Sequence, residues 1–251
     1  MGGVAALAGV ARSRFELEFV EADDGRRRAP LTACWRVAFE DALPVRSFPS
    51  YRGQRNFPGW WWSSTTGRHV GHESWLERDH AMLLDFDPDV VGFASQPFWL
   101  HWSGERGNAR HAPDFFARRG DGTGVVLDVR ADDRVKPEDA EAFAVMARAC
   151  EVVGWSFQRV GTVAPVLAAN VRWLSRYRHP RCGRREDVAG RLLEVFATPR
   201  RLLDGAVAVA DTLVVLPVLY HLLWRRVLVA DLVSAPLGSS SVVCCADRSP
   251  G

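Results

Sequence analysis

Two segments with the composition of β-strands, residues 111–117 and 124–130, are joined by the turn-forming sequence Arg-Arg-Gly-Asp-Gly-Thr. A hairpin centred on Asp121 pairs residues whose numbers add to 242, so it places Asp114 directly opposite Asp128, with Cβ atoms roughly 5 Å apart. Because side chains alternate along a strand, Arg130 then lies on the same face, opposite Ala112.

Two carboxylates at this spacing repel each other, and a divalent cation between them would remove the penalty. Mg²⁺ prefers carboxylate oxygens and keeps several water ligands, as the hydrolysis of a phosphodiester requires. A guanidinium at Arg130 would then face the scissile phosphate. A second interpretation, two solvated aspartates at strand ends, fits the pattern equally well, and a slip of one residue in register would separate the pair.

The segments that surround this hairpin predict an α/β fold. A helix is expected from Glu73 to Leu84, followed by strands at 90–95 and 98–102. Pro137 has the position of a first helical residue, and the spacing of apolar residues after it predicts a helix that runs to about residue 153. A strand at 155–160 completes a mixed sheet flanked by helices.

The N-terminal residues predict strands as well. Apolar and polar residues alternate at 15–19 and again at 35–39, which predicts a hairpin around a polar turn at 22–28. Residues 47–69 are rich in proline, glycine, arginine and aromatic residues, and we expect them to form a loop.

Beyond Gly161 the pattern becomes helical, and a short hairpin is expected within residues 227–243. This order predicts a small helical C-terminal module, for which a winged-helix-like arrangement is one interpretation. The chain therefore divides into N-terminal strands with an aromatic and basic loop (1–70), a core (71–161) and a basic helical module (162–251). Residues 171–201 hold nine arginines against three acidic residues, so both DNA contact and a solvated basic face are compatible with this segment.

Composition narrows the class of protein. The 251 residues carry a formal net charge of +2, which argues against a polycation but permits a local basic face. Five cysteines form no CxxC pair, which indicates a reducing compartment and argues against a structural zinc site. The start of the chain lacks the apolar region of a signal peptide, and the apolar run at 212–224 is too short to span a bilayer. We expect a cytoplasmic protein without a membrane partner.

Three motifs resemble those of TnsA-like endonuclease subunits of heteromeric transposases. They are His-Glu-Ser-Trp-Leu-Glu-Arg at 72–78, Val-Gly-Phe-Ala-Ser-Gln-Pro at 91–97 and His-Ala-Pro-Asp-Phe at 111–115. Together with Asp128-Val129-Arg130 they follow the order of PD-(D/E)xK nucleases, in which a helical glutamate precedes Pro-Asp and then an acidic residue, any residue and lysine. The resemblance covers roughly residues 50–161.

This resemblance implies a restriction-endonuclease-like core and a nuclease that depends on Mg²⁺, with Mn²⁺ able to replace it. It also implies nicking of double-stranded DNA at transposon ends, in partnership with a DDE-type transposase. Glu73, Asp114 and Asp128 would hold the metal, and the Val129 carbonyl could add a ligand. Glu73 also fits the ordinary role of an acidic residue in a first helical turn, and Glu77 is expected to be a solvated neighbour.

Arg130 departs from the motif, because the motif has lysine at this position. Arginine stays protonated and cannot accept a proton, but it can stabilise charge that develops on a phosphate. Either the metal suffices to activate water, or Lys136 reaches back into the site, or activity is impaired. Because all but one of the 32 basic residues are arginine, we favour the first of these.

Other residues are candidates for contact with DNA, and they are Arg52, Arg55, Arg68, Gln96, Arg172 and Arg176. The first three arginines could bind phosphate, and the aromatic residues interleaved with them, Tyr51, Phe57 and Trp60 to Trp62, could stack on bases; an aromatic loop packed across the sheet is an alternative. Two rival functions stay open: a stand-alone nuclease of restriction or defence, and a catalytically inactive nuclease-like subunit that binds DNA or assembles a complex.

Overall fold

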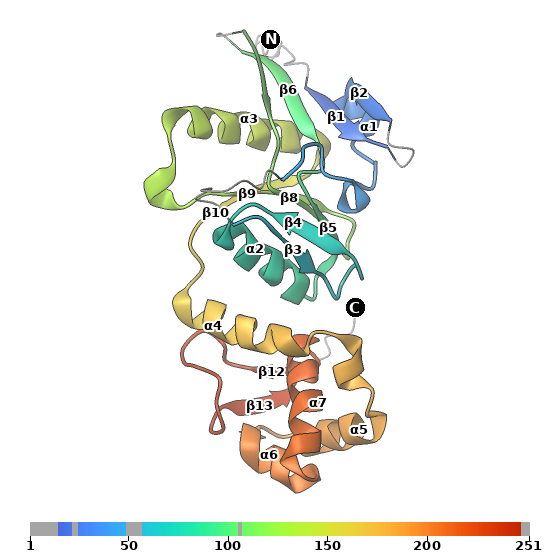
Figure 1. Cartoon of the computed structure of the whole chain (residues 1–251), viewed down its shortest axis with the longest axis vertical. Helices are drawn as coiled ribbons and strands as arrows, with labels where there is room; N and C mark the ends of the chain where they lie inside the picture. The colour runs from blue at the N-terminus through green and yellow to red at the C-terminus, as the bar shows by residue number, and fades with distance from the viewer. Residues whose placement is uncertain (1–14, 22–24, 49–56, 105–106, 247–251) are drawn as a thin grey trace, which may run out of the picture.

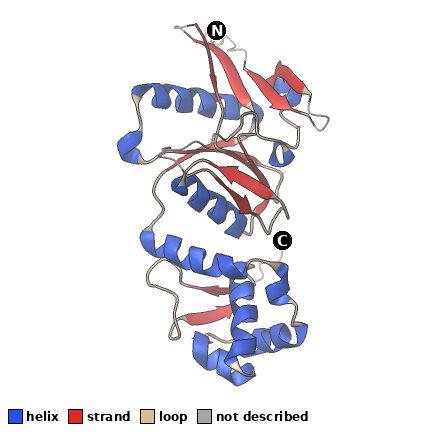
Figure 2. Cartoon of the chain, viewed as in Figure 1, coloured by secondary structure: helices blue, strands red, loops and turns tan. Residues whose placement is uncertain are grey.

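The computed structural model describes residues 15–21, 25–48, 57–104 and 107–246, which form a mixed α/β structure (Figures 1 and 2). The strands are β1 (Glu16–Val20), β2 (Arg26–Pro30), β3 (Gly59–Trp62), β4 (His69–His72), β5 (Val90–Ser95), β6 (Trp99–Gly104), β7 (Gly107–His111), β8 (Phe115–Arg119), β9 (Gly124–Val129), β10 (Ser156–Val160), β11 (Arg200–Arg201), β12 (Leu228–Ala230) and β13 (Val242–Cys245). The α-helices are α1 (Leu31–Cys34), α2 (Trp75–Phe86), α3 (Pro137–Val153), α4 (Pro165–Leu174), α5 (Glu186–Val195), α6 (Leu202–Val209) and α7 (Thr212–Trp224). The short 3₁₀ helices are η1 (Phe39–Asp41), η2 (Asp132–Arg134), η3 (Ser175–Tyr177) and η4 (Pro180–Gly183).

The central sheet has the strand order β10-β9-β8-β5 and lies between α2 and α3 (Figure 1). β9 is antiparallel to β8 and parallel to β10, which follows it in the chain after α3. In the hairpin of β8 and β9, Phe115 pairs with Leu127 and Phe116 pairs with Val126. These numbers add to 242, so the predicted register is confirmed.

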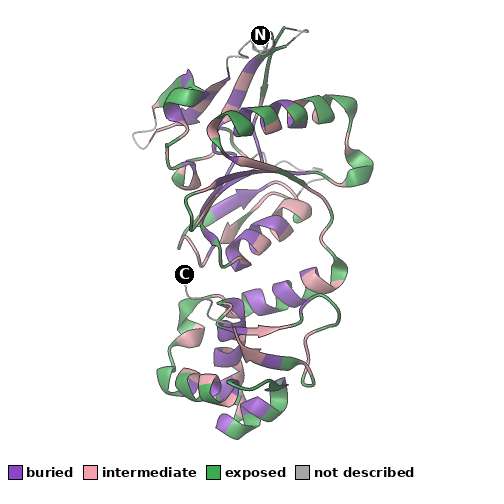
Figure 3. Cartoon of the chain, turned by 180° about the vertical axis from the view of Figure 1, so that it is seen from behind, coloured by how far each residue is buried: buried purple, intermediate pink, exposed green. Residues whose placement is uncertain are grey.

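Alternation along this hairpin divides the core between the two faces of the sheet. Phe116 and Val126 belong to a buried cluster that includes Met146 of α3, whereas Phe115 belongs to another that includes Ala81 of α2. Burial of a large apolar side chain stabilises a fold by about 1.5–3 kcal/mol. Such contacts hold the inner face of each helix against the sheet, while the outward face of α3 is exposed (Figure 3).

The predicted strand at 111–117 is divided between two sheets. β7 ends at His111 and pairs with β6, whereas β8 begins at Phe115 and pairs with β9. Pro113 lies in the gap and has no N–H for a sheet hydrogen bond, so the chain leaves one sheet and bends at Asp114 to enter the other.

The second sheet has the order β2-β1-β6-β7 and contains a correction. The prediction of a strand at 35–39 is wrong, because this segment forms a turn that leads into η1. β1 pairs with β2 along one edge and with β6 along the other, so no edge of β1 is left for a third strand. Phe39 is nevertheless buried, and its ring makes edge contacts with Phe98 and Phe116.

The segment 47–69, expected to be a loop, contains β3 and the first residue of β4. Tryptophan is a favoured strand residue, and this preference outweighs the glycines and prolines around it. The buried carboxylate of Asp85 in α2 anchors the hairpin, because it accepts hydrogen bonds from the Trp61 indole N–H at 3.0 Å and from the Ser63 hydroxyl at 2.8 Å.

The C-terminal part has the element order α5, β11, α6, α7, β12, β13, and its sheet has the strand order β11-β13-β12. β12 and β13 are antiparallel, so the predicted hairpin is confirmed. Met82 and Phe86 of α2 share a buried cluster with Leu219 and Trp224 of α7. Helix α2 therefore packs against the C-terminal helices as well as against the central sheet. Within the described ranges, no helix combines the length and the apolar character needed to cross a bilayer.

Candidate active site

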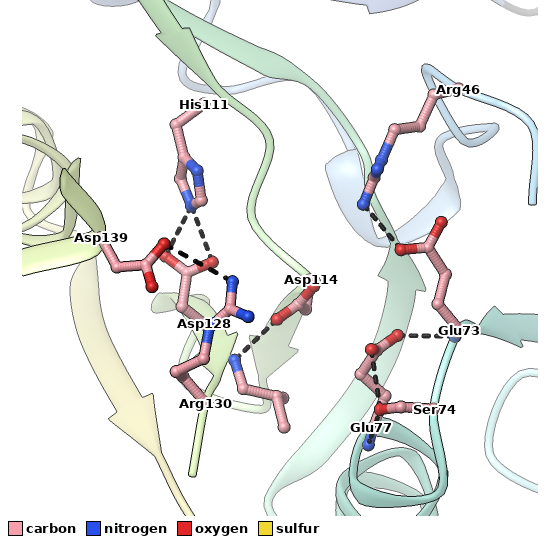
Figure 4. Close-up of polar contacts among 10 residues, drawn as sticks. Arg46, Glu73, Ser74, Glu77, His111, Asp114, Asp128, Arg130 and Asp139 are labelled. Atoms are coloured by element: carbon pink, nitrogen blue, oxygen red, sulfur yellow. Dashed lines mark hydrogen bonds and ion pairs between the residues drawn. The ribbon is translucent and has the colours of Figure 1, made fainter. Parts of the chain in front are cut away.

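Asp114 lies at a bend beside the end of β9 (Figure 4). Its backbone carbonyl accepts a hydrogen bond from the backbone N–H of Gln96 at 3.0 Å, which extends the pairing of β8 with β5. Its carboxylate accepts a hydrogen bond from the backbone N–H of Val129 at 2.7 Å. The backbone of one neighbouring strand and the end of another therefore fix the position of this side chain.

The pKa of the Asp114 carboxyl is raised well above its ordinary value. Burial among protein atoms is the largest cause, and the negative charges of Asp128 and Glu77 add to it. The hydrogen bond from Val129 and the charge of Arg130 act in the opposite direction. A nearby cation stabilises the ionised form of a carboxyl group in such surroundings more than it does in water. The negative charges of Asp128 and Glu77 therefore both act on the Asp114 carboxyl.

Asp128 is almost fully buried, with 2% of its surface exposed. The Nε2 atom of His111 lies 2.8 and 3.0 Å from its two carboxylate oxygens (Figure 4). An ionised carboxylate can only accept hydrogen bonds, so the imidazole is the donor. The charge of Asp128 also affects Cys150 in α3. The pKa of this thiol is raised to about 12, mainly by burial and next by the Asp128 charge.

His111 is a site residue that the sequence did not identify as functional. It belongs to β7 in the neighbouring sheet, and its ring also contacts Phe143 of α3 edge-on, with ring centres 6.1 Å apart. Residues in a hairpin can be paired by arithmetic, but a contact between two sheets cannot, so no local pattern connects His111 with Asp128.

Glu73 and Glu77 have different surroundings from those expected. Glu73 precedes α2 instead of opening it, and its carboxylate forms an ion pair with Arg46 at 2.9 Å (Figure 4). Glu77 accepts hydrogen bonds from the Glu73 backbone N–H at 2.7 Å and from the Ser74 hydroxyl at 2.9 Å. The Ser74 hydroxyl accepts one from the Glu77 N–H at 3.1 Å, so Ser74 is the N-cap residue of α2.

Glu77 is therefore not a solvated neighbour, as was expected. It is partly buried, and this burial is the main reason that its pKa is raised. Its charge acts on Asp114, whereas Glu73 is directed to Arg46. The Ser-x-x-Glu spacing, which is typical of a helix N-terminus, was visible in the sequence and could have identified Glu77 as a side chain held by hydrogen bonds.

Arg130 follows β9 and has a side chain that is 45% exposed. Its guanidinium lies 3.6 Å from a carboxylate oxygen of Asp139, near the start of α3, and its charge lowers the pKa of Asp114. Lys136 is exposed at the N-terminal cap of α3, where its backbone N–H donates to Asp139 at 3.2 Å. Arg130, and not Lys136, is among the charges that shift the pKa of Asp114.

Gln96 is 1% exposed, and neither the nitrogen nor the oxygen of its side-chain amide has a hydrogen-bond partner among the described residues. Its backbone φ angle is +46°, in the left-handed region that costs a residue with a side chain about 1–3 kcal/mol. Buried polar groups are normally paired, and strained backbone is concentrated at functional sites. Gln96 combines both features next to Asp114.

The remaining arginines predicted to contact DNA do not meet at this site. Arg68 pairs with Asp41 and also donates to the Glu40 carbonyl at 3.2 Å. Arg172 joins α4 to α2 through an ion pair with Asp79 at 3.0 Å. The guanidinium of Arg176 lies 5.0 Å from the ring centre of Trp173. Arg52 and Arg55 lie outside the described residues.

The side chains around Asp114 have the donor chemistry that a hard divalent cation prefers, because Asp128 and Glu77 are also carboxylates. As placed, however, the described part of the chain contains no group of three or more His, Cys, Asp or Glu side chains that could hold a metal ion. His111 holds Asp128 and Arg46 holds Glu73. Metal binding would require a further ligand side chain to approach Asp114 and Asp128.

Comparison with known proteins does not identify a relative, because no protein-family model matches the chain and no curated protein matches it significantly.

Proposed function

We propose that this protein is a Mg²⁺-dependent DNA endonuclease subunit of a heteromeric transposase, which nicks DNA at transposon ends. The observation that carries the nuclease assignment is the position of the buried Asp114 carboxylate at the end of β9, where it accepts from the Val129 N–H and is exposed to the charges of Asp128, Glu77 and Arg130. Clustered carboxylates repel one another and destabilise a fold. A bound divalent cation removes this repulsion and can promote the hydrolysis of a phosphodiester.

The order of elements supports a restriction-endonuclease-like core. Helix α2 is followed by β5 and the antiparallel hairpin of β8 and β9, and α3 then leads to β10, parallel to β9. In the C-terminal part, the order helix, strand, two helices and a hairpin resembles a winged helix. The assignment to a transposase rests on the three sequence motifs.

The chain's own groups have separate roles in this proposal. Asp114 and Asp128, with Glu77 or Glu73, would hold Mg²⁺, which supplies Lewis-acid chemistry and neutralises the clustered charge. The Val129 N–H orients the Asp114 carboxylate. Arg130 stays protonated, so it stabilises negative charge on the phosphate and does not accept a proton.

Nicking of supercoiled plasmid by the purified protein tests this function. We expect nicked product with Mg²⁺ or Mn²⁺, none with EDTA, and none for Asp128→Asn even though this variant folds. Asp121→Asn is the matched control, because Asp121 lies in the exposed turn of the same hairpin and should leave nicking unchanged. Full activity of Asp128→Asn would contradict the assignment. Co-purification with a DDE-type transposase would favour the transposase subunit over a stand-alone nuclease.

One observation favours the rival without catalytic activity. Asp128 and Glu73 each have a basic protein partner, and arginine replaces the lysine of the motif. Under this alternative the protein binds DNA or assembles a complex, and purified protein would bind DNA but would not nick it with any divalent cation.

A further inference from the structure

A groove with a volume of about 670 Å³ is lined in part by Arg46, the ion-pair partner of Glu73. Its lining includes Arg26 of β2, residues 44–48, and the first two residues of β3, Gly59 and Trp60. Small-ligand sites have volumes of roughly 300–1,000 Å³, so the groove can hold a group the size of a nucleotide. It cannot enclose a double helix, whose major groove alone is about 12 Å wide.

The groove offers an aromatic surface and positive charge. Trp60 is 60% exposed, and Phe48 supports its ring through an edge contact with ring centres 5.4 Å apart. Phe48 in turn packs where Gly71 has no side chain, since a Cβ atom there would lie 2.4 Å from the Phe48 ring. A large aromatic ring that is held in place and left open to solvent is suited to stacking.

The positive charge comes from Arg26 and Arg46. Arg26 donates to Glu18 and to the Val45 carbonyl, both at 3.0 Å, which leaves donors of its five-donor fork for another acceptor. Arg46 has a 40% exposed side chain and donates to Glu73 at 2.9 Å (Figure 4). Aromatic surface with flanking guanidinium groups is the chemistry that binds bases and phosphates of an unpaired strand.

Backbone hydrogen bonds connect the groove with the carboxylates. Val45 in the groove wall donates to the Gln96 carbonyl at 2.9 Å, and Gln96 donates to the Asp114 carbonyl at 3.0 Å. Arg46 makes a second connection through Glu73. The groove wall is therefore two backbone hydrogen bonds from Asp114 and one ion pair from Glu73.

We propose that this groove binds an unpaired nucleotide of the cleaved DNA strand, with Trp60 stacked on its base and Arg26 and Arg46 at its phosphates. This rests on the proposed nuclease function and specifies its substrate as DNA that is locally unpaired next to the cut. A fully paired duplex would present phosphates to the arginines but no free base face to Trp60.

Fluorescence anisotropy in EDTA can test the groove without cleavage. Two labelled probes are compared at one salt concentration: a fully paired duplex and the same duplex with a short internal bulge. We expect the protein to bind the bulged probe more tightly, and Trp60→Ala to weaken that binding by about 10-fold or more, as loss of one base stack does. Binding of the paired probe should change less than about 2-fold, within the error of such comparisons.

Two further variants separate stacking from loss of structure. Trp60→Phe should keep most of the preference for the bulge, because phenylalanine retains an aromatic face. Trp99→Ala is the matched control, since Trp99 also lies beside an arginine, Arg110, but belongs to β6 outside the groove, and it should bind both probes like the unchanged protein. Melting temperatures establish that each variant is folded.

The outcomes distinguish this proposal from the nuclease proposal. Two results would overturn the groove proposal without bearing on the nuclease proposal. One is that Trp60→Ala weakens binding of both probes equally, and the other is that the unchanged protein has no preference for the bulged probe. A bulge preference that Trp60→Ala removes, in a protein that nicks no DNA, supports the groove and contradicts the nuclease.

Discussion

Removal of the His111 imidazole should destabilise the fold, because it leaves the Asp128 carboxylate buried without its donor. Both oxygens of Asp128 lie within 2.8–3.0 Å of Nε2, and the aspartate side chain is 3% exposed. A hydrogen bond to a charged group contributes about 1.5–3 kcal/mol, and an uncompensated buried charge costs more. Because His111 is itself 24% exposed and water can enter the space it leaves, we expect His111→Ala to lose about 2–4 kcal/mol.

Thermal and urea denaturation measure this loss. For a chain of this length, about 2–4 kcal/mol lowers Tm by roughly 5–15 °C. The double variant His111→Ala with Asp128→Asn should recover much of the loss, since the buried charge is then absent. If Asp128 also binds Mg²⁺, saturating Mg²⁺ should raise the Tm of His111→Ala more than that of the unchanged protein, because the cation binds the native state with less competition.

His101→Ala is the matched control. The Nε2 atom of His101 lies 2.9 Å from a Glu18 carboxylate oxygen, but Glu18 is 19% exposed and also accepts from Arg26. We expect this variant to lose less stability than His111→Ala does, because Glu18 keeps the Arg26 guanidinium as a charged donor. A His111→Ala variant that melts with the unchanged protein, or no more than His101→Ala does, would refute the reasoning about buried charge.

Two further predictions concern Asp114 and Arg130. The folded-state pKa of Asp114 is raised, so the native state holds its proton where the unfolded chain has lost it, and stability falls as pH rises above the unfolded pKa of about 4. Asp114→Asn should therefore match the unchanged protein in urea denaturation at acidic pH and exceed it increasingly as pH rises towards neutrality; a pH-independent difference would contradict this. Arg130→Ala should reduce nicking on the order of 10²-fold or more and Arg130→Lys should retain most of it, as for loss and conservation of one preorganised donor. Lys136→Ala should have little effect on rates measured against pH, and a greater loss for Lys136→Ala than for Arg130→Ala would assign the cationic role to the lysine.

Much of the central sheet could be predicted because its signals are local. The turn at Asp121 and the alternation on either side of it determine the register of β8 and β9, and Pro137 and Gly154 mark the ends of α3. The same kind of signal failed at residues 35–39, where the alternation is real but both edges of β1 are already occupied. A strand pattern states that a segment can pair and does not state that an edge is available.

The carboxylate site shows the same division. The register predicted from the hairpin brings Asp114 and Asp128 together, whereas the choice between Glu73 and Glu77 depends on Arg46 and on the N-terminal cap of α2. The Ser-x-x-Glu pattern of this cap spans four adjacent residues and could have been recognised. The partner of Glu73 could not, since Arg46 is 27 residues away and approaches through tertiary packing.

Residues close together in the chain thus specified the order of elements, the register of the hairpin and the position of the two aspartates. Tertiary structure alone placed His111 from one sheet against Asp128 in another, left the Gln96 amide buried without a partner in the described residues, and assembled the groove from β2, residues 44–48 and β3. The physical reason is range. Turn geometry, alternation and capping act between neighbours in the sequence, whereas contacts between sheets follow from the burial of apolar surface over the whole core, which no short pattern encodes.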